Sequence, residues 1–208
     1  GAPTHPACAE AAQKTGERLE SLGHKVELAS PAELDDQVLP AHVVAVISTW
    51  TKYELQTWSA KAGKPISQGD VEAGTWSFAE LAASVGATQY VEAIEAIHMA
   101  ARRAALWWND FDLLLTPTIA EPPPPHGEWV PTEDNPMRGL MKSSAIVNFV
   151  APFNVTGQPA ISIPRETHDG LPIGVQLVAG YGREDVLIRV ASQIEAAAPW
   201  IDRTPVVY

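Results

Sequence analysis

PAISIPRETHDGLPIGVQLVA, residues 159–179, is the stretch that decides the fold of this 208-residue chain. Its two ends, 159–164 and 174–179, are apolar and rich in the β-branched residues that strands favour. The polar run 166–170 between them ends in Asp-Gly, a turn signal. The stretch therefore predicts two strands joined as a β-hairpin.

The rest of the chain alternates between helical and strand patterns. An apolar run at 111–116 predicts a strand that is buried on both faces. The alternating run 24–28, after a glycine that would end a helix, predicts a further short strand. Apolar residues at helical spacing predict helices over 6–22, 39–60, 77–85, 88–109, 140–149 and 184–198. This alternation indicates the α/β class, and no repeat or interior boundary divides the chain, so we expect a single unit over 1–208.

The composition of the chain disfavours some classes of binding partner and bears on its cellular compartment. The net charge of −11 and a sequence pI near 4.9 disfavour nucleic acid and anionic membranes as partners. A single cysteine, Cys8, excludes an intrachain disulfide, and with no apolar run near ~20 residues we expect a cytoplasmic protein. Residues 1–6 lack an initiator Met and the features of a signal peptide, so we expect a longer, processed or trimmed protein.

Several motifs occur in an order that is typical of one enzyme family. FDLLLTPT (111–118) is followed by NVTGQP (154–159), LPIGVQ (171–176) and a closing helix that ends near Pro199-Trp200. Each motif alone is weak, but the last two in succession are specific. The chain resembles the C-terminal half of amidase-signature hydrolases. The resemblance implies an α/β fold that forms the C-terminal part of the amidase-signature domain, with a mixed β-sheet flanked by helices.

The same resemblance implies where the chemistry lies. The family uses a Ser–cis-Ser–Lys triad in which the second Ser attacks an amide carbonyl, without a metal or an organic cofactor. Its Gly/Ser-rich nucleophile loop is absent from this sequence, so we expect the triad upstream of residue 1, no catalytic residue here, and no activity from this chain alone. The six histidines show no metal-ligand spacing. Lys142-Ser143-Ser144 has the residue types of the triad but no flanking glycines, and we interpret it as a helix face.

This half of the family fold implies a substrate pocket for a small-molecule amide. The loop 116–120 leaves the end of a predicted strand, where α/β sites lie, and a helix over 146–153 precedes the NVTGQP motif. We therefore predict six substrate-binding residues: Thr118, Asn148, Phe149, Val150, Phe153 and Asn154. Core packing explains each of them as readily. An apolar lining of this kind favours aliphatic or aryl amides, and the complete protein is expected to be an amidase acting on linear amides.

Two other functions fit the sequence. A non-catalytic domain could keep the pocket wall and bind a ligand or a protein partner. In that case a truncated sheet would expose an edge and favour a homodimer or other self-association. The chain could also be part of a glutamine-hydrolysing amidotransferase subunit, although no ionic pair for an amino-acid substrate is evident in 140–160.

Overall fold

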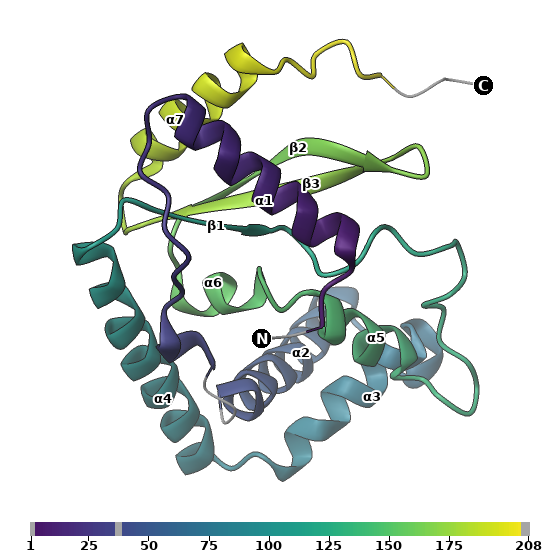
Figure 1. The fold of residues 1–208 in the computed structure, drawn as a ribbon. Helices are drawn as coiled ribbons and strands as arrows, with labels where there is room; N and C mark the ends of the chain where they lie inside the picture. The colour runs from purple at the N-terminus through teal and green to yellow at the C-terminus, as the bar shows by residue number, and fades with distance from the viewer. Residues whose placement is uncertain (1–2, 36–38, 205–208) are drawn as a thin grey trace. The chain divides into compact units, whose positions relative to one another are not determined.

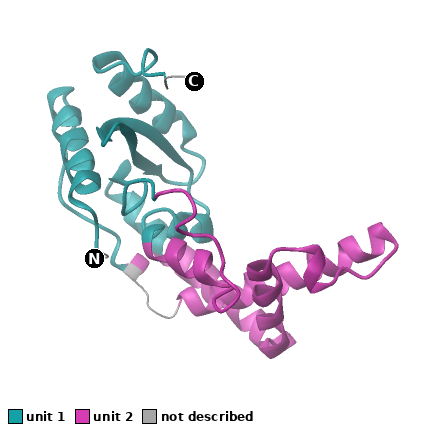
Figure 2. Ribbon diagram, turned by 90° about the vertical axis from the view of Figure 1, so that its right-hand side faces the viewer, with its two compact units in different colours: residues 1–32, 104–124, 146–208 teal, residues 33–103, 125–145 magenta. Residues whose placement is uncertain are grey.

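The computed structural model describes residues 3–35 and 39–204. These residues divide into two compact units, which Figure 2 shows in different colours. Unit 1 takes its residues from 1–32, 104–124 and 146–208, and unit 2 takes them from 33–103 and 125–145. The single unit expected from the sequence stays a prediction.

Unit 1 is built on a three-stranded sheet in the order β1-β3-β2 (Figure 1). The strands are β1 (Leu113–Pro117), β2 (Ala160–His168) and β3 (Leu171–Ala179), and both pairings are antiparallel. The α/β class is therefore confirmed, while the sheet in the described residues is antiparallel where we expected a mixed one. Pro117 ends β1 at a sheet edge, where its missing N–H removes no bond between strands.

The predicted hairpin is confirmed, but its strands are longer than the sequence indicated. β2 runs on to His168 and β3 begins at Leu171, so the turn contains only Asp169 and Gly170. Both turn residues have positive φ angles, 50° and 79°. An Asp-Gly pair with these angles matches the right-handed twist of the flanking strands, so the run 166–168 stays in the ladder instead of forming a loop.

Two helices cover one face of the sheet. These are α1 (Pro6–Ser21) and α7 (Glu184–Ala197), both predicted correctly, and Figure 1 shows α6 on the opposite side of the sheet from α7. Alternate β3 residues Val175, Leu177 and Ala179 are fully buried in the resulting core. Gln176 and Val178, which point to the other face, are buried as well. The central strand is thus covered on both sides. The strand predicted at 111–116 is present as β1, with Leu114 buried and Leu113, Leu115 and Thr116 half-buried.

The strand expected at 24–28 is wrong. The structure has no regular element there, and Leu28 is completely exposed. Val26 packs beside Gly16, and His24 pairs with Gln193 through a 2.8 Å side-chain hydrogen bond. A short alternating run becomes a strand only where a partner strand is available, and here the segment leaves α1 alongside helices.

The helical region before the NVTGQP motif also differs from expectation. α5 spans Arg138–Ile146 and does not reach residue 149, and a separate helix, α6, spans Ala151–Thr156. Pro152 lies in the first turn of α6, where a missing N–H costs nothing. Gly157 ends α6 in the left-handed conformation with a φ of 84°. Asn154 therefore lies inside a helix and not after one.

Unit 2 is helical. Its α-helices are α2 (Leu39–Ala62), α3 (Ala73–Leu81), α4 (Ala87–Ala105), which continues into unit 1, and most of α5. Short 3₁₀ turns extend or join them: η1 (Ala32–Asp35), η2 (Gln68–Asp70), η3 (Ala82–Ser84) and η4 (Leu106–Asn109), the last belonging to unit 1. The predicted helices 39–60, 77–85 and 88–109 are confirmed apart from these 3₁₀ ends and an earlier start for α3. Trp50 in α2 donates from its indole N–H to the hydroxyl of Tyr90 in α4 at 3.0 Å.

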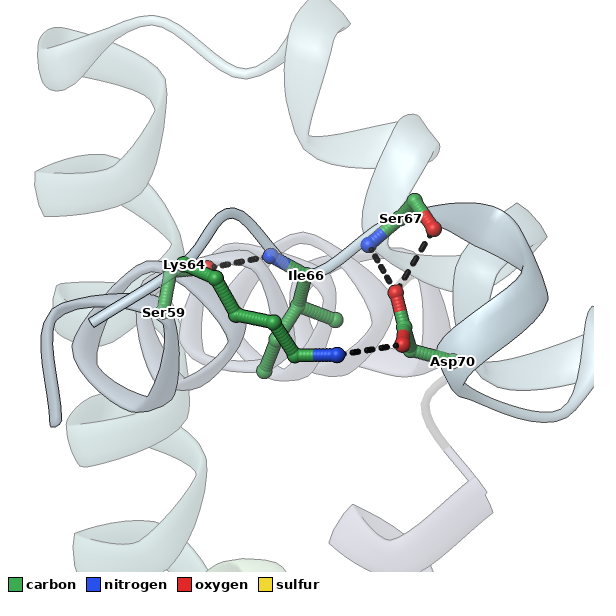
Figure 3. Close-up of polar contacts among 5 residues, drawn as sticks. All are labelled: Ser59, Lys64, Ile66, Ser67 and Asp70. Carbon is green, nitrogen blue, oxygen red and sulfur yellow. Dashed lines mark hydrogen bonds and ion pairs between the residues drawn. The ribbon is translucent and has the colours of Figure 1, made fainter. Parts of the chain in front are cut away.

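The connection from α2 to α3 is held by a compact polar network (Figure 3). The Ser59 hydroxyl accepts from the backbone N–H of Ile66 at 2.9 Å. The carboxylate of Asp70 accepts from the N–H and the hydroxyl of Ser67 and pairs with Lys64 at 3.2 Å. These bonds fix a turn that has little apolar burial.

Across the described residues, none of the helices has the length and apolarity that a membrane span requires.

Candidate functional site

The side chain of Gln176 joins three segments of unit 1. It lies on β3 with an exposure of 4%. Its Nε2 donates to the carbonyl oxygen of Phe149 at 2.7 Å and to the hydroxyl of Thr116 on β1 at 3.2 Å. A buried amide in a strand requires such partners, because leaving it unpaired is costly. The segment between α5 and α6 is thereby attached to the sheet beside the end of β1.

Two hydroxyl groups meet across β3 at the same end of the sheet. Thr118 follows β1, its N–H donates to the carbonyl of Gly174 at 3.1 Å, and its Oγ1 is 2.6 Å from the Oγ of Ser162 on β2. A Cβ on Gly174 would lie 3.0 Å from both hydroxyl oxygens. The glycine therefore lets side chains from the two outer strands reach each other over the central one.

This hydroxyl pair lines a pocket of about 170 Å³ in unit 1. The other lining residues are Cys8, Ile119, Glu121, Pro123, Pro172, Ile173 and Gly174. Most of this surface is apolar, with the hydroxyls and one carboxylate as its polar groups. Such a pocket can hold a small, largely apolar group and hydrogen-bond one polar end of it.

The surroundings of Cys8 in this pocket disfavour the reactive form of its thiol. Cys8 is 1% exposed, and burial together with the negative charge of Glu121 raises the pKa of its thiol. The thiolate is the reactive form of cysteine, so a raised pKa disfavours reaction at this residue.

The structure brings some of the six predicted site residues together and separates others. Thr118 lines the pocket, and half-buried Phe149 is attached to the same end of the sheet through Gln176. Val150, also half-buried, is the N-cap residue just before α6, and Asn148 and Asn154 are exposed. Phe153 is 5% exposed and packs edge-to-face on Trp108 with ring centroids 6.3 Å apart. Substrate binding by these residues stays a prediction.

Three residues of this region were not singled out from the sequence. Gln176 is a lone polar residue in an apolar strand, and that pattern indicates a buried amide with specific partners. Ser162 and Gly174 lie in the strands quoted above. Their role depends on the strand order, which brings the Thr118 side chain to Ser162 past Gly174 on β3. The linear sequence does not show the strand order or this contact.

Lys142-Ser143-Ser144 is a helix face, as interpreted from the sequence. The ammonium of Lys142 forms an ion pair with Glu128. The hydroxyls of Ser143 and Ser144 donate back to the carbonyls of Leu140 and Met141 at 3.0 and 2.8 Å. Serine hydroxyls within helices commonly donate to a backbone carbonyl of the preceding turn in this way. No metal-binding group of three or more His, Cys, Asp or Glu side chains occurs within 3–35 and 39–204.

Comparison with known proteins defines the class. The model of the amidase family matches residues 1–188, so this chain belongs to the amidase family, whose members are amidase-signature enzymes. It is 35% identical over 207 residues to the 6-aminohexanoate-cyclic-dimer hydrolase of Pseudomonas sp. (strain NK87), covering 96% of this chain and 42% of that protein. An acylamidase of Rhodococcus erythropolis is 33% identical over 100 residues, 47% of this chain and 20% of its own.

Solved structures give the same result. The structure of 6-aminohexanoate cyclic dimer hydrolase complexed with substrate superimposes with a TM-score of 0.91 at 34% identity, over 98% of this chain and 44% of that one. A bacterial aryl acylamidase of the amidase-signature family gives a TM-score of 0.69 at 19% identity over 95% and 41%, a likeness of fold alone. The chain thus spans about 42% of the length of the curated cyclic-dimer hydrolases that it matches.

Proposed function

We propose that this chain is the C-terminal part of an amidase that hydrolyses carboxylic amides, and that it forms one wall of the substrate pocket. The observation that carries the proposal is the 35% identity to a cyclic-dimer hydrolase over nearly the whole of this chain, which corresponds to 42% of that enzyme. In this proposal the Ser–cis-Ser–Lys triad lies upstream of residue 1. The chain alone is then inactive.

The contacts at the end of the sheet support a positioning role for this part of the protein. Gln176 holds the backbone of Phe149, and the ring and the side chain of Val150 remain half-buried and available to a ligand. The nucleophilic Ser would attack the amide carbonyl while apolar side chains from this chain orient the acyl group. Holding reactants in one geometry is a large part of the rate enhancement in such reactions.

The apolar character of these residues supports uncharged aliphatic or aryl amides as substrates. We propose linear carboxylic amides as one substrate class. Cyclic amides are a second class, favoured because relatives at 35% identity are named for the cyclic dimer of 6-aminohexanoate. A pocket lined by few polar groups discriminates between substrates mainly by the shape and length of their acyl part. Each added methylene then changes kcat/KM by a modest factor.

The test is an assay of the complete protein on acetamide, benzamide, an aryl anilide and the cyclic dimer of 6-aminohexanoate. A serine-directed fluorophosphonate probe is applied in parallel, and the labelled peptide is mapped. We expect turnover of at least one amide and labelling of a serine outside residues 1–208. Labelling of Ser143 or Ser144 would contradict the upstream triad. If the complete protein shows no turnover and no labelling, the alternative of a non-catalytic binding domain is favoured.

Self-association is a separate proposal. The order β1-β3-β2 places β1 and β2 at the edges of the described sheet, and an unpaired edge can pair with a second chain. We propose a homodimer through such an edge. Analytical ultracentrifugation of the complete protein measures it, and a monomer at tens of micromolar would refute it.

A further inference from the structure

Arg165 occupies an unusual place in β2. Pro164 lies opposite Gly174 and Glu166 lies opposite Ile173, so Arg165 is the extra residue of a β-bulge. A bulge redirects the side chain of the residue that it inserts and occurs frequently beside functional sites. Arg165 is only 7% exposed, although arginine is rarely buried unless it is paired.

One donor of the Arg165 guanidinium has no partner within the described residues: its Nε is buried without a hydrogen bond. The neighbouring Glu166 carboxylate contributes a favourable charge. Taking an ionised group out of water costs several kcal/mol unless an opposite charge and hydrogen bonds compensate for it. A bound anion that accepts from Nε would offset part of this cost.

A second arginine contacts Arg165. Arg203 follows α7 and donates from Nη1 to the backbone carbonyl of Arg165 at 3.1 Å. A third, Arg18, lies in the last turn of α1. Burial lowers the pKa of Arg165, and the positive charges of Arg203 and Arg18 lower it further, against the opposing effect of the Glu166 carboxylate. The charges of three arginines thus act in one region of a chain whose net charge is −11.

We propose that Arg18, Arg165 and Arg203 form a binding site for a small oxyanion, of the phosphate or carboxylate class. Guanidinium groups present planar pairs of N–H donors that match two oxygens of such an anion. In this proposal Arg165 supplies the buried and positioned donor, while the exposed Arg18 and Arg203 add positive charge. The site is independent of the proposed amidase chemistry, since none of the three residues lines the pocket described above.

Titration of the complete protein with inorganic phosphate, followed by calorimetry, tests this proposal. Sodium chloride at equal ionic strength is the reference, because phosphate also stabilises folded proteins non-specifically. Arg165→Met removes the charge and keeps most of the apolar stem. Arg189→Met is the matched control, since Arg189 is an exposed arginine on α7 paired with Asp185 at 3.1 Å.

We expect saturable phosphate binding that weakens at least tenfold in Arg165→Met and is unchanged in Arg189→Met. Should Arg165→Met fail to fold, the exposed variants Arg18→Met and Arg203→Met each give the same test with a smaller loss. Absence of saturable binding, or equal binding in all variants, would overturn the proposal. Strong destabilisation by Arg165→Met without phosphate binding would also overturn it, and would assign the counter-ion to a carboxylate of the protein itself.

Discussion

Gln176 on β3 and Phe149 in the turn before α6 are joined by a 2.7 Å hydrogen bond from the side-chain amide to the backbone carbonyl. The bond connects the central strand of the sheet to the segment that carries half of the predicted pocket residues. The bond therefore positions the backbone of Phe149, and its ring is half-buried. The proposal that this chain forms a wall of the substrate pocket depends on this placement of Phe149.

Replacing Gln176 with Met should separate the two segments. The change removes both hydrogen bonds of the amide while keeping the length of the side chain, and it leaves the Phe149 carbonyl without its partner. We expect a loss of about 1–3 kcal/mol in the free energy of unfolding, measured by urea denaturation of the complete protein. Gln13→Met is the control, because Gln13 is an exposed residue that bonds only to Glu17 in its own helix. Equal effects of the two changes would contradict this role.

Gly174→Ala should disturb the hydroxyl pair. The new Cβ would lie 3.0 Å from the oxygens of Thr118 and Ser162, so at least one of these hydroxyls must shift from its place in the 2.6 Å hydrogen bond. We expect a destabilisation of about 1–3 kcal/mol. Adding Ser162→Ala should recover part of it, since that change removes one of the crowded atoms. Additive effects in the double-mutant cycle would contradict the crowding.

Gly69→Ala provides the matched control for the glycine experiment. Nothing lies within 4 Å of a Cβ placed on Gly69, and its φ is not positive. We expect this variant to be as stable as the parent or slightly more stable, because alanine restricts the unfolded chain. The same thermal unfolding scan measures both glycine variants.

Asp70 should contribute to stability in a defined pH range. Hydrogen bonds from Ser67, followed by those of Lys64 and its charge, lower the pKa of Asp70 to about 2 (Figure 3). A carboxyl whose folded pKa lies below its unfolded value of about 3.9 stabilises the fold above that value, and loses the contribution as the pH falls towards 2. The stability difference between parent and Asp70→Asn should therefore be constant from pH 5 to 8 and shrink below pH 4.

Ser67→Ala identifies the origin of that pH dependence. Loss of the Ser67 hydroxyl removes the hydrogen bond that contributes most to the low pKa of Asp70. The midpoint of the acid-induced loss should then move to higher pH, which urea unfolding across pH 2–6 measures. An unchanged midpoint would show that the network in Figure 3 does not act on Asp70 in solution.

Cys8 should be unreactive in the folded protein. Its thiol is buried and its pKa is raised by burial and by Glu121. Iodoacetamide at pH 7.5 should leave the Cys8 peptide unmodified in the native protein and alkylate it in urea, as mass spectrometry can show. Rapid labelling under native conditions would mean that the pocket opens around α1.

The sequence predicted the hairpin and the long helices because those patterns are local. Asp169-Gly170 specifies its turn by backbone conformation, and the spacing of apolar residues in 39–60 decides for helix over strand. The run 24–28 has the same alternation as a strand, but no partner strand is beside it, and a linear pattern cannot show a partner. α5 and α6 are separated by the turn at 147–150. The residues of this turn are mostly apolar, so the sequence pattern did not distinguish it from a continuing helix.

The site was less predictable because its contacts join distant residues. The contact of Thr118 with Ser162 needs the order β1-β3-β2 and a missing side chain at Gly174. The partners of Gln176 come from residues 60 and 27 positions away. Phe153 is aromatic and close to the motif, which suggested a pocket residue, whereas its packing on Trp108 depends on α6.

Phe149 and Phe153 should therefore respond differently to truncation. Phe153→Ala removes a ring that packs on Trp108, so we expect about 3–5 kcal/mol of lost stability. Phe149→Ala should leave more of the stability intact, because its ring is half-buried and its backbone contact to Gln176 survives. Urea denaturation of both variants in the complete protein measures the difference. A larger loss for Phe149→Ala would contradict the assignment of Phe153 to the core.

The most direct test of the pocket-wall proposal is the kcat/KM of the complete protein for linear amides of increasing acyl length and for the cyclic dimer of 6-aminohexanoate. Parent and Phe149→Ala are compared, with Ile188→Ala, an exposed position on α7, as the control. We predict that Phe149→Ala changes the ranking of the substrates, while Ile188→Ala leaves it as in the parent. An unchanged ranking in a folded and active Phe149→Ala protein would contradict the proposal that this chain shapes the substrate pocket.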